Sequence, residues 1–226
     1  MKFIKIIKNI LKKTGIYRPS YFTATHKYWE DRYKKGGNSG AGSYNRLAEF
    51  KAEVINEFIK RKNISTVIEF GCGDGNQLKY FDIPLYIGYD ISPTVVECCT
   101  KIFENDKSKT FKVLCNNVYE TADLSLSLDV IFHLVEDTTF MEYMERLFRA
   151  SEKFVIIYAS NYYDKQVMVY EKISHVRHRK FTDWIDMYAT DFKLIEHIPN
   201  KYPFNEHEPD ITSFADFYIF QKQNKK

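Results

Sequence analysis

Short apolar runs alternate with helical patterns of apolar residues along most of the chain. Leu47, Phe50, Val54 and Phe58 recur at intervals of three and four residues, which predicts an amphipathic helix that ends near residue 63. Strand-length apolar runs follow at residues 66–70, 86–91, 109–115, 129–134, 154–159, 192–198 and 214–221. Further helices are predicted at residues 93–103, 138–150 and 181–189. Strands that alternate with helices favour a mostly parallel sheet covered on both faces, and the last two strands predict an antiparallel end.

The first 45 residues differ from the rest of the chain. Residues 2–13 predict a basic amphipathic helix, with lysines around an apolar stripe of Phe3, Ile6, Ile7, Ile10 and Leu11. Such a helix could lie on an anionic membrane surface, or it could dock on the domain or on a second subunit. Residues 34–43 hold four of the nine glycines and form a loop that serves as a lid or as a simple connector. We therefore divide the chain into residues 1–45, an N-terminal helix with a lid segment, and residues 46–226, the main domain.

Composition narrows the function classes. Lys and Arg number 33 against 30 Asp and Glu, and a net charge of +3 is too balanced for a dedicated nucleic-acid-binding protein. No apolar run reaches the roughly 18 residues of a membrane span. Lysines interrupt the apolar stretch of residues 1–13, so this stretch is not a secretory signal. Four cysteines without a CxxC pair favour free thiols in the cytoplasm, and residues 2–13 leave the inner face of the membrane open as a location.

A glycine-rich turn follows the first predicted strand, with the sequence Glu69-Phe70-Gly71-Cys72-Gly73-Asp74-Gly75-Asn76. Glycine lets the backbone turn sharply and approach a ligand without a Cβ in the way. Asp90 lies at the carboxyl end of the second predicted strand, where a carboxylate can accept hydrogen bonds from both hydroxyls of a ribose. The interval between the two features predicts a nucleotide-type cofactor site.

The pattern E-x-G-x-G-x-G followed by this acid resembles the class I S-adenosylmethionine-dependent methyltransferases. The resemblance spans about residues 65–222 and implies a single Rossmann-like α/β domain with a seven-stranded, mostly parallel sheet of order 3-2-1-4-5-7-6, preceded by an N-terminal helical lid. It implies S-adenosyl-L-methionine as the cofactor. The cofactor-binding residues that it implies are Glu69, Gly71, Gly73 and Gly75 at the amino-acid end, Asp90 at the ribose, Ile91 on the adenine, and Asn117 and Val118 at the adenine edge.

Residues 127–137 match the segment after the fourth strand of this family, which faces the transferred methyl group. With a strand predicted at residues 129–134, Asp129 lies at the front of the strand and His133 at its far end. This placement departs from the family pattern and weakens the case for a carboxylate base. His133 is the candidate catalytic base, because an imidazole with a pKa of about 6.5 can take a hydroxyl proton at neutral pH. Its alternative role is a hydrogen bond to the cofactor or to a neighbouring group.

A closer resemblance is to small bacterial methyltransferases encoded with capsule and surface-polysaccharide genes, some of them linked to methyl phosphoramidate decoration. The motifs that carry it are YWEDRY at residues 28–33, SGAGS at 39–43 with Arg46, Phe50 and Lys51 after it, and HVRHRKF at 175–181 with Trp184. It implies O-methylation of a sugar or phosphoramidate-type precursor. The alternatives are a catalytically inactive, cofactor-binding partner subunit and an NAD-dependent oxidoreductase, and the Gly75-Asn76 spacing argues against the oxidoreductase.

A basic cluster between the fifth strand and the next helix is the candidate acceptor site. Its substrate-binding residues are His175, Arg177, His178 and Arg179. The arginines could bind a phosphate or carboxylate, or the cluster could be solvated surface charge. No pair of acids matches the two histidines, so no metal is predicted.

The expected partner is a small-molecule or glycan-precursor acceptor, which could be anionic, and a homodimer stays open. Arg46 or Lys51 could meet the cofactor carboxylate or an acidic acceptor, with solvated charge as the alternative.

Overall fold

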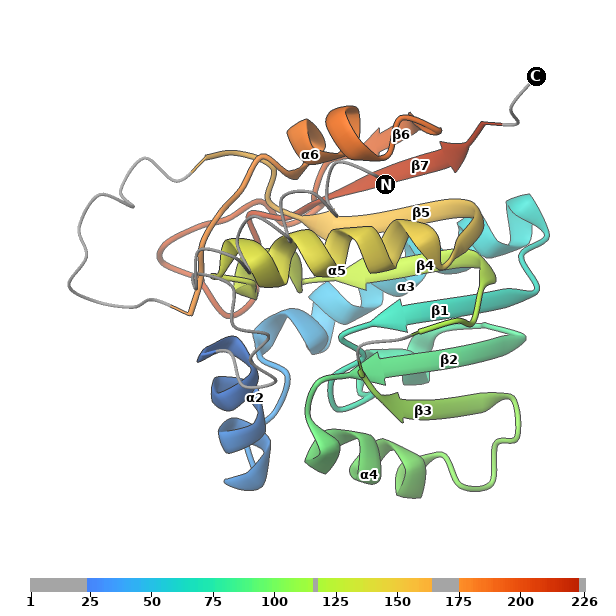
Figure 1. Cartoon of the computed structure of the whole chain (residues 1–226). Helices are drawn as coiled ribbons and strands as arrows, with labels where there is room; N and C mark the ends of the chain where they lie inside the picture. Colours follow the sequence, from blue (N-terminus) through green and yellow to red (C-terminus); the bar gives the residue numbers. More distant parts are fainter. Residues whose placement is uncertain (1–23, 116–117, 164–174, 224–226) are drawn as a thin grey trace, which may run out of the picture.

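Seven strands form one twisted sheet at the centre of the molecule (Figure 1). The computed structural model describes residues 24–115, 118–163 and 175–223. The strands are β1 (Thr66–Phe70), β2 (Leu85–Asp90), β3 (Lys109–Val113), β4 (Ala122–Leu128), β5 (Ser151–Ala159), β6 (Phe192–Ile198) and β7 (Asp216–Lys222). They lie in the order β3-β2-β1-β4-β5-β7-β6, and only the pairs made by β7 are antiparallel. The predicted fold is confirmed.

The predicted fourth strand at residues 129–134 is wrong. The observed strand, β4, begins seven residues earlier and is buried along its whole length. Its sequence ADLSLSL conceals this burial, because Ser125 and Ser127 look solvent-exposed in the pattern. In the structure the Ser125 hydroxyl donates to the Leu147 carbonyl at 2.8 Å, and the Tyr143 hydroxyl donates to Ser127 Oγ at 2.7 Å. Helix-borne partners therefore satisfy the buried serines.

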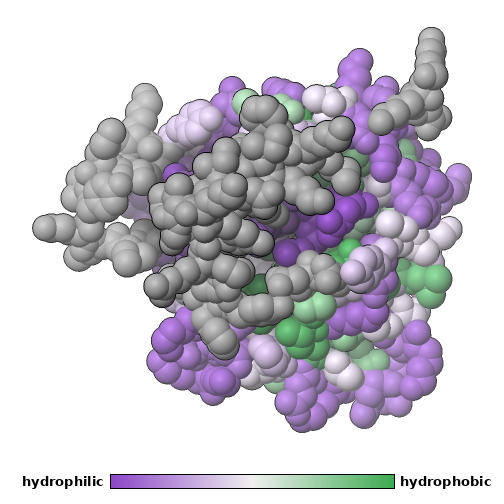
Figure 2. All heavy atoms as spheres, viewed as in Figure 1, coloured by the Kyte–Doolittle hydropathy of each residue, from purple (hydrophilic) through white to green (hydrophobic). Residues whose placement is uncertain are grey.

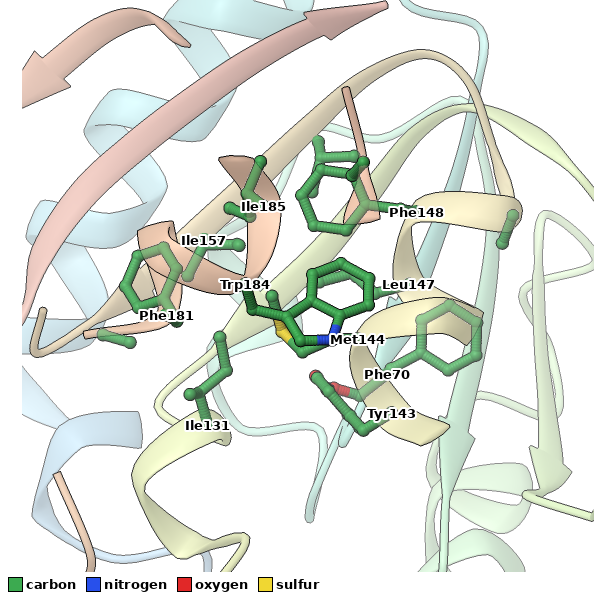
Figure 3. Packing of buried hydrophobic residues seen from close by; sticks show 14 of the residues in the cluster. Phe70, Ile131, Tyr143, Met144, Leu147, Phe148, Ile157, Phe181, Trp184 and Ile185 are labelled. Atoms are coloured by element: carbon green, nitrogen blue, oxygen red, sulfur yellow. The ribbon is translucent and has the colours of Figure 1, made fainter. Parts of the chain in front are cut away.

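Helices cover both faces of the sheet, as the alternating pattern predicts. Helix α3 (Asn45–Lys62) lies behind the sheet in Figure 1, and α5 (Asp137–Arg149) crosses in front of it. Helix α6 (Phe181–Tyr188) packs beside α5, where Trp184 and Ile185 meet Leu147 and Phe148 (Figure 3). Helix α4 (Pro93–Ile102) begins at a serine cap, because Ser92 Oγ accepts from the Val95 N–H. Two buried apolar clusters result, one on each face of the sheet.

The N-terminal part of the described chain lies beyond the carboxyl ends of the central strands (Figure 1). It comprises helix α2 (Ala24–Lys34) and the short 3-10 turn η1 (Ala41–Ser43). Two further 3-10 turns follow strands, η2 (Gln77–Tyr80) and η3 (Ile131–His133). The division of the chain into residues 1–45 and 46–226 stays a prediction, and the predicted helix at residues 2–13 lies outside the described residues.

The described surface is mostly hydrophilic on the face shown in Figure 2, with small apolar areas between charged side chains. Among the helices that the structure describes, none has both the length and the apolar character needed to cross a bilayer.

Candidate active site

The glycine loop after β1 opens a space at the carboxyl edge of the sheet. Gly71 and Gly73 have φ angles of +83° and +58°, in the left-handed region that favours glycine. A Cβ on Gly71 would lie 2.5 Å from Val130 Cγ2, and one on Gly73 would lie 2.3 Å from Ser39 Oγ. Gly75 faces away from this space, since its Cβ would meet the Phe103 ring at 2.9 Å. The first two glycines therefore let Val130 and Ser39 approach the loop closely, and the third does the same for the end of α4.

Asp90 ends β2 beside this loop. Its Oδ2 accepts from the Gly73 N–H at 3.0 Å, and its Oδ1 accepts from the Ser92 N–H at 2.9 Å. Burial raises the pKa of Asp90 to about 6, against hydrogen bonds that lower it. Each carboxylate oxygen has two acceptor positions, so both oxygens can take a further hydrogen bond from a ligand. The arrangement suits a vicinal diol such as that of a ribose.

A cavity with about 650 Å³ of empty space, its mouth included, lies over the loop. Its lining includes four of the residues for which cofactor contacts are predicted: Gly71, Gly73, Asp90 and Ile91. Its size and its position at the carboxyl ends of parallel strands are typical of nucleotide sites. The exposed glycine backbone and the acidic acceptor beside it fit a nucleoside that carries an amino-acid chain.

Three of the remaining predicted cofactor residues, Glu69, Gly75 and Val118, are not among the residues that line this cavity. Glu69 is fully buried beneath the loop, where its carboxylate accepts from Tyr86 Oη at 2.6 Å and Gln77 Nε2 at 3.1 Å. Burial raises the pKa of Glu69 to about 7. Val118 is buried away from the cavity, and Asn117 lies outside the described residues. Glu69 therefore ties β1 to η2 and supports the loop from below.

The lid segment closes the cavity from the other side. Trp29, Tyr33 and Ser39 line it together with Ser43. The Ser39 N–H donates to Asp74 Oδ2 at 2.9 Å, and the Asp74 N–H donates back to Ser39 Oγ at 2.8 Å. These reciprocal bonds hold the segment against the glycine loop.

A second clamp fixes helix α2. Glu30 accepts from the hydroxyls of Ser92 and Thr94 at the start of α4. Partial burial opposes ionisation of this carboxyl, yet hydrogen bonds from Ser92, Lys34 and Thr94 outweigh it and lower the pKa of Glu30 to about 2. The carboxylate is therefore charged throughout the neutral range, and it sits at a helix N-terminus that favours negative charge.

A second cavity adjoins the first and shares Trp29, Ser39, Asp129 and His133 with it. It holds about 810 Å³ of empty space, its mouth included. Seven of its lining residues carry aromatic rings: Tyr28, Trp29, Phe132, His133, His175, Phe204 and Phe214. The His133 and His175 rings stack with centroids 5.6 Å apart, and His175 stacks on Tyr28 at 4.7 Å. The shared residues mark the place where two ligands would meet.

Asp129 stands at this junction, and its predicted place at the front of the fourth strand is wrong. It follows β4 directly, with a φ of +58° that is rare for a residue with a side chain. Lys51 Nζ donates to its Oδ2 at 2.6 Å, and the Lys51 side chain is entirely buried. A carboxylate therefore does occupy the carboxyl end of the fourth strand, and the apparent departure from the family pattern disappears.

The sequence contained a signal for this pair. Lys51 falls on the apolar stripe of α3, four residues after Leu47 and four before Ile55, and all three are buried. A lysine in such a stripe needs a buried acid, because an unpaired ammonium is costly to bury. Only the position of β4 identifies that acid.

His133 lies in η3 and not at a strand end. Its Nδ1 is 3.0 Å from the His175 carbonyl, which can only accept, so Nδ1 carries the proton and Nε2 keeps its lone pair. Burial lowers the pKa of His133 to about 4, below the predicted 6.5. The ring is therefore neutral near pH 7 and is a weaker base than the sequence suggests.

The basic cluster divides between two places. His175 lines the second cavity, whereas Arg177, His178 and Arg179 line a separate hollow beside the start of α5. Both guanidinium groups contact Asp137 Oδ1, at 3.0 Å for Arg177 and 2.9 Å for Arg179. The Arg179 side chain is only 8% exposed, against 34% for Arg177. Among the described residues, no group of three potential ligands could hold a metal ion.

Neither of the two cations expected near the cofactor carboxylate is free to bind it. Lys51 is paired with Asp129. Arg46 Nε donates to the Ile211 carbonyl, and its guanidinium stacks 4.4 Å from the centre of the Tyr202 ring. Both side chains therefore contact other parts of the protein in place of the predicted contact with the cofactor carboxylate.

Comparisons with known proteins agree with this site. Residues 68–156 match the family described as a methyltransferase domain. No curated protein sequence matches the chain significantly.

Solved structures share the fold at low sequence identity. Magnesium protoporphyrin IX methyltransferase from Synechocystis, solved with bound S-adenosylhomocysteine, is 15% identical, with a TM-score of 0.65 over 90% of this chain and 100% of that one. The N-methyltransferase NodS from Bradyrhizobium japonicum, also with S-adenosylhomocysteine, is 11% identical, with a TM-score of 0.63 over 88% and 99%. An O-methyltransferase family protein from Burkholderia thailandensis is 15% identical, with a TM-score of 0.57 over 80% and 57%.

The likeness to solved structures shows the fold. The family match shows that residues 68–156 resemble a methyltransferase domain. The glycine loop, Asp90 and the cavity above them supply the matching cofactor site. Together these findings support an S-adenosylmethionine-dependent methyltransferase with the class I fold.

Proposed function

We propose that this enzyme methylates an oxygen atom of a small acceptor bound in the second cavity. The observation that carries the proposal is the junction of the two cavities at Asp129 and His133. The cofactor supplies a methyl group on a positively charged sulfur. The chain holds the acceptor in line with it and excludes water, which accounts for much of the catalysis of a displacement.

The acceptor that we propose is a sugar or phosphoramidate-type precursor of a surface polysaccharide. All three motifs of the closer resemblance contribute to the second cavity: Tyr28 and Trp29 from the first, Gly40 and Gly42 from the second, and His175 from the third. Apolar ring faces with a few polar groups between them suit a ring-shaped acceptor with hydroxyls. An inactive, cofactor-binding partner subunit is the alternative, and it predicts binding without turnover.

An anionic part of the acceptor would reach Arg177 rather than Arg179. The Arg177 side chain is the more exposed of the two, and Arg179 also packs with its guanidinium 4.9 Å from the centre of the Phe140 ring. An acceptor phosphate that displaces Asp137 from Arg177 could form a bidentate contact. A cytoplasmic location at the inner membrane face and a homodimer are further proposals, which rest on the sequence alone.

Turnover with labelled cofactor tests the proposal. We expect methyl transfer to an oxygen of a capsule precursor, and we expect Phe204→Ala to raise the acceptor KM about tenfold or more with cofactor affinity unchanged. Phe204 lines only the second cavity, and its ring lies 5.8 Å from that of Phe214. Tyr119→Ala is the matched control, because Tyr119 is 83% exposed and lines neither cavity. A methylated nitrogen in the product, or an unchanged KM for Phe204→Ala, would contradict the proposal.

The lid gives a separate prediction. We expect limited proteolysis to cleave residues 28–46 faster in the free protein than with S-adenosylhomocysteine, because lid contacts with the cofactor add to the Glu30 clamp. Glu30→Ala should speed cleavage of the free protein further. Asp31→Ala is the control on the same helix, since the exposed Asp31 pairs with Lys27 one turn away. Equal cleavage with and without ligand would rule out a lid that closes on the cofactor.

A further inference from the structure

We propose that Asp129 is the catalytic base of this enzyme and that the buried Lys51 positions it. The inference deepens the proposed function and rests on it, because a base is needed when the acceptor is a hydroxyl. Three observations support the proposal: Asp129 lines both cavities, its partner Lys51 is buried, and the backbone of Asp129 is in the left-handed conformation.

The Asp129 carboxylate faces both ligand spaces. Its side chain is 16% exposed and lines the cofactor cavity and the second cavity. Oδ2 is held by Lys51, and within the part of the chain that the structure describes Oδ1 has no hydrogen-bond partner. Gly42 makes space for the group, since a Cβ there would lie 2.6 Å from Oδ2. One oxygen is therefore anchored and the other is available to an acceptor.

Lys51 contributes charge and orientation. Its ammonium is fully buried, with Asp129 on one side and the Tyr158 ring centre 5.3 Å away. Its ammonium lies 2.6 Å from Oδ2 and balances the negative charge of the carboxylate. The same contact fixes one carboxylate oxygen, so the direction of the other is set by α3 and β4 together.

The backbone at Asp129 indicates a functional constraint. A left-handed conformation of a residue other than glycine is energetically unfavourable and is retained where the surroundings enforce it, often at active sites. Here the Asp129 N–H donates to the Tyr158 carbonyl at 2.9 Å, and Lys51 holds the side chain. These contacts hold the Asp129 carboxylate at the carboxyl end of β4.

Asp129 is chemically better suited than His133 to this role. His133 is a neutral imidazole near pH 7 and carries no charge to oppose the positive charge that develops on the attacking oxygen. In the proposed step the acceptor hydroxyl proton passes to Oδ1 of Asp129. The acceptor oxygen forms a bond to the methyl carbon while the carbon–sulfur bond breaks, and that electron pair stays on sulfur. The products are a methyl ether, a neutral carboxylic acid and a neutral thioether.

Four proteins test the proposal: wild type, Asp129→Asn, Lys51→Met and the double variant. Asp129→Asn keeps the shape but cannot take a proton, so we expect kcat to fall about 100-fold or more. The acceptor KM and the calorimetric affinity for S-adenosylhomocysteine should change less than about threefold. Each single variant leaves one buried partner alone and should lower Tm, whereas the double variant should recover much of the lost Tm without recovering kcat.

The outcomes separate the possible failures. A purely structural pair would give a double variant that regains both Tm and kcat, which would overturn the proposal. An O-methylated product with an unchanged kcat for Asp129→Asn would also overturn it while leaving the proposed function intact. If the wild-type product is methylated on nitrogen instead, the proposed function fails, and the role of Asp129 as a hydroxyl base fails with it.

Discussion

Gly73→Val should abolish measurable binding of S-adenosylhomocysteine, a loss of more than about 100-fold. The valine Cβ would lie 2.3 Å from Ser39 Oγ and 3.3 Å from Tyr33 Oη, both of which come from the lid that closes the cofactor cavity. The φ of +58° adds about 1–2 kcal/mol of strain for a residue with a side chain. To relieve this clash, the residue 73 N–H must move away from Asp90 or the lid must open. Either change removes contacts with the cofactor.

Gly36→Val is the control that isolates strain from the site. Gly36 has a similar positive φ of +78°, is exposed, and has nothing within 4 Å of the added Cβ. The Gly36→Val variant should bind S-adenosylhomocysteine with the same affinity as the wild type, as measured by isothermal titration calorimetry. A folded Gly73→Val variant that binds as well as Gly36→Val would show that the loop does not hold the cofactor.

Cofactor affinity should fall steeply in acid, by about tenfold for each pH unit below about 6. The reason is Asp90, whose pKa is raised to about 6 by burial and whose ionised form is needed to accept hydrogen bonds from two ribose hydroxyls. The Asp90→Asn variant should bind about 10- to 100-fold more weakly at pH 8, because hydrogen bonds to a charged group contribute about 1.5–3 kcal/mol. Its remaining affinity should be nearly independent of pH.

Glu69 requires a control in this experiment, because burial raises its pKa to about 7. Glu69→Gln should retain the fall in affinity below pH 6, since Glu69 lies beneath the loop and outside the cavity lining.

In the free protein, a rise in pH over this range has the opposite effect on stability. The folded pKa of Asp90 exceeds its ordinary value of 3.8, so ionisation of Asp90 lowers the free energy of unfolding as pH rises from about 4 to about 6. A pH-independent affinity in the wild type would contradict the role assigned to Asp90.

The sheet and the cofactor site could be predicted because each depends on local signals. Gly71 and Gly73 must adopt positive φ angles, and glycine is the residue that does so without strain. Asp90 follows a run of strand residues at the usual interval, and parallel pairing of β1 with β2 places it beside the loop. Order within the sheet came from the family resemblance, since strand periodicity carries no information about neighbours.

The acceptor side depends on tertiary partners that periodicity cannot show. Ser125 and Ser127 make β4 look polar in the sequence, so the pattern predicts the strand too late and puts Asp129 at its wrong end. Likewise, the arginines at 177 and 179 look free in the sequence, and only the fold brings Asp137 between them.

Calorimetric titration of the wild-type protein with S-adenosylhomocysteine and with NAD⁺ tests the central claim most directly. The cavity over the glycine loop, with Asp90 in its lining, predicts one molecule of S-adenosylhomocysteine bound per chain and no heat with NAD⁺. Binding of NAD⁺ without binding of S-adenosylhomocysteine would contradict the assignment as a methyltransferase.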